Sequence, residues 1–167
     1  MKRFIVACVV CVCAAAIVGA QTPMPKYGVT VTPEKNVDFT TFKTYSWTKG
    51  QPSAVKEIDT AIVGAVDHEL RTLGMTKSTS GPGDVLVTYY SLTRTDVNLK
   101  AKPDTQGIYP EYSVGTLVVA LLDTDSRKRL LRMRVDKPIE VEPAKLDEAI
   151  KAAAADMFAK YPTRQKK

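Results

Sequence analysis

The sequence is poor in the residues that build metal and thiol sites. It has one histidine, His68, and three cysteines that all lie within its first 13 residues. Transition-metal sites need several histidine or cysteine ligands. A catalytic triad would use His68 as its base, but no nucleophile motif accompanies it. The sequence therefore predicts no metal, no cofactor and no catalytic residue, and it places His68 on the solvated side of a helix.

The first 20 residues have the pattern of a secretory signal peptide. Lys2 and Arg3 form a short basic region, an apolar run follows over 4–18, and small residues precede a cleavage point between Ala20 and Gln21. The apolar run is shorter than the roughly 20 residues of a membrane-spanning helix. We expect a mature chain without cysteine or a transmembrane segment, exported to the periplasm or beyond, with membrane association left open.

Cys8 offers a second interpretation of the same segment. Ile5-Val6-Ala7-Cys8 resembles a lipobox before a lipid-modified cysteine. However, too few residues precede Cys8 for a normal signal, and cleavage there would leave residues 9–20 as an exposed apolar tail. Cleavage before Gln21 is therefore our expectation, and mass spectrometry of the mature N-terminus distinguishes the two.

The chain carries 24 basic and 18 acidic residues, a formal net charge of +6. Loss of Lys2 and Arg3 leaves 22 basic residues against 18 acidic ones, or +4. Part of this excess lies in a basic tail at 163–167, which we expect to be solvated. A nucleic-acid-binding domain needs a basic stripe in an accessible compartment. Because we expect this chain to be exported, we do not expect it to bind a nucleic acid.

Hydrophobic patterning predicts one α+β domain over 27–162, after a short leader at 21–26. Its centre is an antiparallel hairpin. The first arm, 115–122, is apolar on both alternating faces, as a central strand requires. The returning arm alternates, with Leu131, Met133 and Val135 on one face and Arg132 and Arg134 on the other.

Four further strands and two helices complete the predicted fold. The strands are expected at 27–32, 43–47, 84–91 and, at the edge, 94–100, and an irregular segment is expected at 101–113. One helix is predicted between Ser53, as its N-cap, and Gly74, and another from Pro143 to Tyr161. The result is a mainly antiparallel sheet of five or six strands with both helices packed on one face.

Several short segments of this domain carry a resemblance: Val37-Asp38-Phe39, Lys43-Thr44-Tyr45-Ser46-Trp47, Leu73-Gly74, Gly83-Asp84-Val85-Leu86-Val87-Thr88-Tyr89, Gly115-Thr116-Leu117-Val118-Val119, Asp123 and Tyr161-Pro162. In this order and spacing they resemble one family of exported bacterial domains, the domain of unknown function number four-one-three-six. The resemblance implies an envelope location, often as a lipoprotein, and an α+β fold. It implies no known reaction.

Two departures from the family pattern fall in the hairpin. Its turn has Arg127 where the family usually has glycine. Its returning arm has Leu131 and Met133 where the family favours a tryptophan and a glycine. A function that depends on those family residues is in doubt for this chain.

The acidic residues form no recognised site. Asp123-Thr124-Asp125 begins like a calcium loop but lacks its glycine and its terminal glutamate. We interpret both aspartates as turn formers. A carboxylate pair for hydrolysis, drawn from Asp38, Asp84 or Asp123, remains open because spacing along the sequence does not decide it.

The leading functional hypothesis is a non-enzymatic exported domain that binds an envelope protein or an envelope polymer. Tyrosine and arginine are common anchors of binding surfaces, and the candidate residues are Tyr109, Tyr112, Arg132 and Arg134. The alternatives are a periplasmic hydrolase that uses paired carboxylates, and a small-ligand carrier with a cavity between sheet and helices near Trp47. Tyr45 and Trp47 are assigned to the core, with an aromatic ligand box as the alternative. The oligomeric state does not follow from the sequence.

Overall fold

The computed structural model describes residues 27–139 and 143–164. The predicted signal peptide, Cys8, the leader and the last residues of the basic tail lie outside these ranges. No helix among the described residues is long and apolar enough to cross a membrane.

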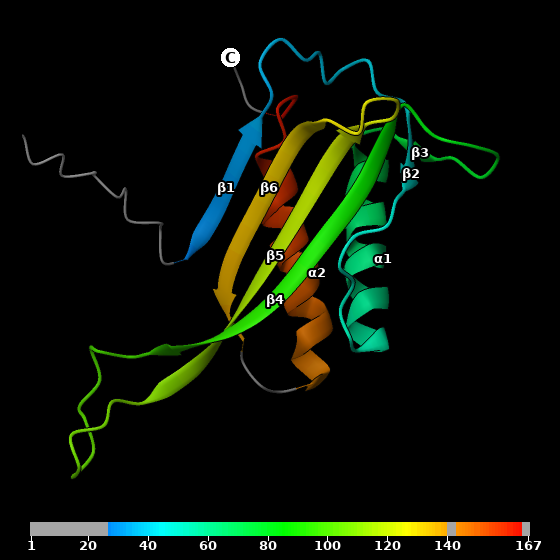
Figure 1. The fold of residues 1–167 in the computed structure, drawn as a ribbon. Helices are drawn as coiled ribbons and strands as arrows, with labels where there is room; N and C mark the ends of the chain where they lie inside the picture. The colour runs from blue at the N-terminus through cyan, green and yellow to red at the C-terminus, as the bar shows by residue number, and fades with distance from the viewer. Residues whose placement is uncertain (1–26, 140–142, 165–167) are drawn as a thin grey trace, which may run out of the picture.

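Six strands form one sheet in the order β1-β6-β5-β4-β2-β3. From β1 to β4 all neighbours are antiparallel, whereas β2 runs parallel to both β4 and β3. Two helices lie on one face of this sheet (Figure 1). The α+β prediction is confirmed. The elements are β1 (Gly28–Pro33), β2 (Thr44–Trp47), α1 (Lys56–Thr72), β3 (Thr76–Lys77), β4 (Val85–Val97), β5 (Glu111–Asp123), β6 (Arg129–Pro138) and α2 (Pro143–Ala159).

Strand β5 occupies the interior position that its apolar sequence predicts. It pairs with β4 along all 13 of its residues and with β6 from Val114 to Leu122. Its alternate side chains are buried on both faces of the sheet, from Val119 on the helix side to Ala120 on the other. On β6, the expected division of faces is also confirmed, since Leu131, Met133 and Val135 are buried and the two arginines that alternate with them are half-exposed.

The turn between β5 and β6 accounts for the glycine preference implied by the resemblance. The Asp123 carboxylate accepts hydrogen bonds from the backbone N–H and the hydroxyl of Ser126, each at 2.7 Å, so its predicted role as a turn former is confirmed. Arg127 has a φ of 59°, in the left-handed region that suits glycine. Its guanidinium donates to the Thr48 hydroxyl at 3.1 Å, so the side chain at this position contacts a neighbouring loop.

A pair of substitutions tests this conformational constraint. Both Arg127→Gly and Arg127→Val remove the contact with Thr48, but only valine brings a β-branched side chain into left-handed backbone. We expect Arg127→Val to be less stable than Arg127→Gly by about 1–2 kcal/mol. Urea unfolding of the two variants measures the difference, and equal midpoints would contradict the role assigned to this turn.

Strand β4 differs from its prediction. The sequence suggested one strand at 84–91 and a separate outer strand at 94–100, but β4 is a single strand that continues to Val97. Residues 111–113, predicted to be irregular, form the start of β5. Residues 95–97 of β4 and 111–113 of β5 pair with each other past the end of β6. They form a two-stranded ribbon that projects from the sheet, and residues 98–110 form the loop at its tip (Figure 1). The prediction was wrong because the strand continues after its apolar pattern has ended.

The start of α1 also differs from its prediction. Ser53 is not the N-cap, because the helix begins at Lys56 with Val55 in the cap position and no side-chain cap. The Ser53 hydroxyl instead accepts the backbone N–H of Val55 at 3.2 Å, and its own N–H donates to the Tyr89 hydroxyl at 3.0 Å. The hydrogen bond to Tyr89 on β4 holds Ser53 outside the helix. At the other end, Gly74 has a φ of 82°, as predicted for the residue that follows the helix.

Two neighbouring residues just before β4, Gly83 and Asp84, contact the start of β2. A Cβ atom on Gly83 would lie 2.6 Å from the Cα of Tyr45, so only glycine allows this approach. The Asp84 carboxylate accepts the backbone N–H groups of Lys43 at 2.7 Å and Thr44 at 2.8 Å. These bonds satisfy donors at the start of β2 and set its parallel register on β4.

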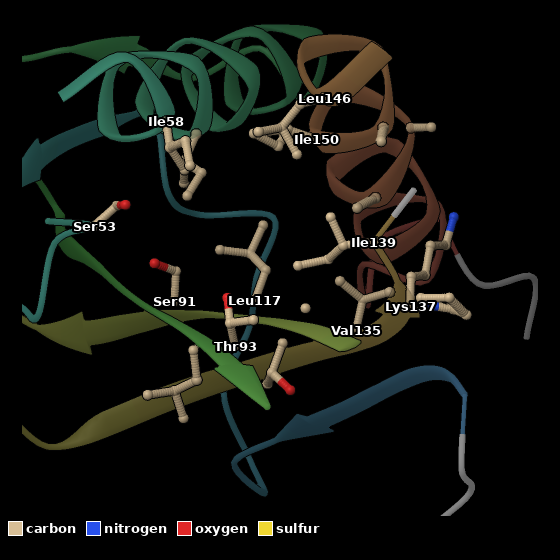
Figure 2. A pocket seen from close by; sticks show the side chains of 18 of the residues that line it. Ser53, Ile58, Ser91, Thr93, Leu117, Val135, Lys137, Ile139, Leu146 and Ile150 are labelled. Carbon is tan, nitrogen blue, oxygen red and sulfur yellow. The ribbon is translucent and has the colours of Figure 1, made fainter. Parts of the chain in front are cut away.

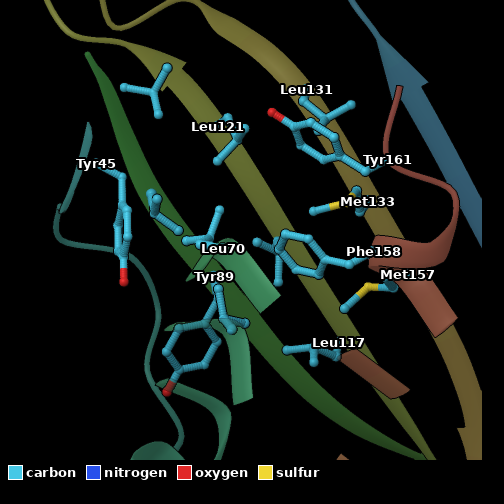
Figure 3. Close-up of a cluster of buried hydrophobic side chains, with 14 of the residues drawn as sticks. Tyr45, Leu70, Tyr89, Leu117, Leu121, Leu131, Met133, Met157, Phe158 and Tyr161 are labelled. Atoms are coloured by element: carbon cyan, nitrogen blue, oxygen red, sulfur yellow. The ribbon is translucent and has the colours of Figure 1, made fainter. Parts of the chain in front are cut away.

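The core lies between the sheet and the two helices (Figure 3). At the C-terminal end of α2 it is filled by aromatic rings: Tyr161 stacks on Phe158 at a centroid distance of 6.2 Å and meets Phe39 edge-on at 5.8 Å. Tyr45 is buried as predicted, and Trp47 is half-buried against Tyr89. This end of the core is densely packed.

Candidate functional site

The other end of the same core is hollow. A cavity of 490 Å³ lies between the sheet and the first turns of both helices (Figure 2). Most of its wall is aliphatic, and it opens near the base of the β4–β5 ribbon. The lining residues are Ser53, Ile58, Ile62, Ser91, Leu92, Thr93, Gly115, Thr116, Leu117, Val135, Lys137, Pro138, Ile139, Lys145, Leu146, Ala149, Ile150, Ala152 and Ala153.

Small side chains from distant parts of the chain create this space. On α2, Ala149 and Ala153 face the cavity where Met157 and Phe158 fill the core farther along the helix. On β5, Gly115 has no side chain, and a Cβ atom there would lie 3.0 Å from Cγ1 of Ile139. Protein interiors contain few voids larger than a water molecule. A lined apolar cavity of this size is the kind of feature that holds a ligand.

The charged residues that line the cavity are all of one sign. Lys137 comes from the end of β6 and Lys145 from the first turn of α2, whereas none of the described lining residues is a carboxylic acid. The ammonium of Lys137 forms an ion pair with Asp156 on α2, and both side chains are about half-exposed. The positive ends of both helix dipoles lie at this end of the core as well. The electrostatic character of the cavity mouth therefore favours an anion.

Trp47 does not line the cavity, although the carrier hypothesis expected the cavity near it. Trp47 lies edge-on against Tyr89 at a centroid distance of 6.2 Å, and its ring nitrogen donates to the Asp67 carboxylate at 2.8 Å. The Tyr45 hydroxyl donates to the same carboxylate oxygen, also at 2.8 Å. Burial, together with this bond, raises the pKa of Tyr45. Both aromatic residues of β2 are thus held against α1 by Asp67.

A second polar cluster lies on the sheet face opposite the helices, around Asp136. This carboxylate is 6% exposed and accepts hydrogen bonds from Arg134 at 2.8 and 2.9 Å, Arg94 at 2.9 Å and the Thr116 hydroxyl at 2.6 Å. Burial alone would raise the pKa of Asp136, but the bonds from Arg134, Thr116 and Arg94 outweigh it and hold the pKa at about 2. The cluster is a charged network that fixes three strands together.

Two of the four predicted binding residues join this network. Arg134 bonds Asp136 directly, and Tyr112 contacts the Tyr27 hydroxyl, which donates to Asp96 at 3.4 Å. Tyr112 lies in β5 and not in the irregular loop where the sequence placed it. The other two candidates lie elsewhere: Tyr109 is half-buried in the loop at the ribbon tip, and Arg132 is half-exposed farther along β6. None of the four lines the cavity.

The candidate carboxylates for hydrolysis each have a structural partner. Asp38 accepts the backbone N–H and the hydroxyl of Thr40. Backbone N–H bonds from Lys43 and Thr44 lower the pKa of Asp84, and the hydroxyl and N–H of Ser126 lower the pKa of Asp123. A hydrolytic general acid needs a raised pKa. The shifts at Asp84 and Asp123 have the opposite sign.

The remaining predicted positions are accounted for. His68 is exposed on α1, as expected. Among the described residues, no three histidine, cysteine or acidic side chains gather as metal ligands. Arg164, which the sequence places in the basic tail, bonds the Glu69 carboxylate on α1 at 3.2 Å. The cavity is what sequence analysis located least well, because its wall joins residues from five separate segments.

The Asp136 network makes a prediction about acid stability. Its pKa of about 2 is lower than the ordinary value of 3.8, so its stabilisation is complete above about pH 4 and is lost as the pH falls toward 2. A shift of this size corresponds to about 2 kcal/mol. We expect Asp136→Asn to lower the unfolding free energy at pH 7 by about that amount and to flatten its decline between pH 4 and 2.

Urea unfolding across this pH range measures both effects. Asp147→Asn is the matched control, because Asp147 forms an exposed pair with Lys151 that should contribute at most about 1 kcal/mol. An Asp136→Asn variant with the wild-type pH dependence would show that the network does not stabilise the fold.

The comparisons with known proteins agree with this architecture. The model of a family described as "Domain of unknown function (DUF4136)" matches residues 29–163. No curated protein matches the chain.

Three solved structures are similar in fold. A DUF4136 family protein from Bacteroides thetaiotaomicron is 12% identical, with 85% of this chain and 99% of that chain covered and a TM-score of 0.56. A PDZ domain protein from Parabacteroides distasonis is 17% identical with a TM-score of 0.61; the match covers 84% of this chain but 36% of that one. A PelC dodecamer from Paraburkholderia phytofirmans is 9% identical, with coverages of 83% and 98% and a TM-score of 0.54.

Proposed function

The chain belongs to the DUF4136 family, and we propose that it is an exported, non-enzymatic domain of the cell envelope that binds a small apolar molecule between its sheet and its helices. The observation that carries the proposal is the 490 Å³ cavity. Its size lies in the range of about 300–1,000 Å³ that ligand pockets occupy, and its mostly aliphatic wall with a few polar groups is also typical of them.

The location rests on the N-terminal sequence. The basic, apolar and small-residue regions of 1–20 support export, and the family resemblance supports an envelope location. An apolar ligand has low solubility in the aqueous space of the envelope. A domain that encloses such a molecule would carry it there or hold it at a fixed place.

A single substitution on β4 tests the binding proposal. Ser91 points into the cavity (Figure 2), so Ser91→Phe fills part of the space with a ring that β-strand backbone accepts well. We expect this variant to lose binding of a neutral naphthylamine dye, by at least tenfold in Kd, while its unfolding free energy stays equal or rises. Dye fluorescence in titration and urea unfolding measure the two effects.

Thr95→Phe is the matched control. Thr95 lies on the same strand, two alternations farther along the ribbon, and does not line the cavity. It should leave dye binding unchanged. If the wild-type protein fails to bind the dye, or if both variants bind like the wild type, the cavity is not a binding site.

A second candidate function is binding of an envelope protein or polymer through the sheet face opposite the helices. The observation that favours it is the chain of contacts that links Tyr112, Asp96, Arg94 and Arg134 on that face. Cosedimentation with isolated envelope polymer tests it. Tyr112→Ala should reduce the sedimented fraction, and an unchanged fraction would remove this candidate.

A further inference from the structure

We propose that the ligand of the cavity is a single-chain amphiphile: an aliphatic chain that lies in the cavity and an anionic head held at its mouth by Lys137 and Lys145. This inference rests on the proposed function, because it names the class of molecule for the same site. Three features of the cavity support it, namely its volume, the chemistry of its wall and the position of its charges.

The volume suits a chain and not a single small ring. An apolar protein cavity of roughly 150 Å³ holds one benzene molecule. The present cavity, at 490 Å³, is about three times larger and is bounded on three sides by the sheet, α1 and α2. One aliphatic tail fits such a space, whereas a lipid with two tails would need much more.

The wall suits an aliphatic tail. Branched aliphatic side chains from four elements face the space, including Ile58, Leu117, Val135 and Ile150 (Figure 2). Most of the few hydroxyl groups, such as that of Ser91, come from the strands. A tail of methylene groups gains affinity from every group that it buries, and its flexibility lets it follow a wall made by the sheet and two helices.

The charges lie where the head of such a molecule would emerge. Lys137 follows Val135 at the end of β6, and its stem lies along the wall while its ammonium reaches Asp156 outside (Figure 2). An ion pair between half-exposed side chains is weak. An anionic head can therefore share the Lys137 ammonium at little cost. Lys145 also lines the cavity, from the first turn of α2, where the helix dipole favours negative charge.

The acidic residues of α1 at this end do not oppose the head. Glu57 and Asp59 lie in the first turn of α1, but neither is among the lining residues. The carboxylate of Asp59 accepts the Tyr89 hydroxyl and so points toward β4. Among the described lining residues the charged side chains are thus both lysines, and the nearby Asp156 carboxylate is paired with one of them.

The test compares ligands that share a tail and differ in their head. Dodecanoate, dodecyl phosphate and dodecanol are titrated against the dye-loaded full-length mature protein and against a variant with both Lys137→Gln and Lys145→Gln. We expect the double variant to lose affinity for the preferred anion by at least tenfold and to keep its affinity for dodecanol. The tighter of the two anions identifies the head group. Across a series of chain lengths, Kd should fall about fourfold per methylene until the cavity is full.

A matched charge control accompanies the double variant. Lys128→Gln with Lys151→Gln removes the same net charge at exposed lysines that do not line the cavity. It should bind every ligand like the wild type. Equal loss in both double variants would show that general charge attraction, and not the cavity mouth, holds the head.

The outcomes separate the two proposals. If dodecanol displaces the dye and the anions gain nothing from the lysines, the cavity binds apolar molecules but the anionic head is wrong. If no chain displaces the dye and the dye itself does not bind, the proposed function fails as well.

Discussion

The structure depends on the pairing of β5 with both of its neighbours. Because β5 is apolar on both faces, it is stable only inside a sheet that is covered on at least one side. Strand β4 accompanies it over its whole length and β6 over most of it. This three-stranded centre provides the flat surface on which α1 and α2 lie, and it also forms the floor of the cavity. The cavity thus forms where the helices lie on the most regular part of the fold.

The two helices are packed unequally along their length. Where α2 ends, methionine, phenylalanine and tyrosine side chains occupy the interface with the sheet. Where it begins, alanines face a glycine on β5 and a serine on β4. At this end of α2, the small residues leave the volume of the cavity open. Larger side chains that filled this space would make the core more stable.

Much of the fold could be predicted from the sequence, and the candidate site much less. The central hairpin, the faces of β6 and both helices have strong periodic patterns, and each is present. Strand β4 beyond Ser91 was not recognised as continuous because both of its faces become polar there, so the alternation fades while backbone pairing continues. A strand of two residues, such as β3, is too short to show a periodic pattern. The cavity is lined by small residues that lie far apart in the sequence, such as Ser91, Gly115 and Ala149, and their meeting at one cavity leaves no local signal in the sequence.

The pairing of β1 with β6 bears on the order in which the chain folds. Gly28 pairs with Asp136, so the first strand of the domain completes the sheet only after nearly all of the domain has been made. Contacts between β4, β5 and β6 are closer in sequence and cost less loop entropy to form. A nascent chain therefore holds β1 unpaired next to the segment that precedes it. The edge of the sheet that β1 forms is therefore completed only after β6 has been made.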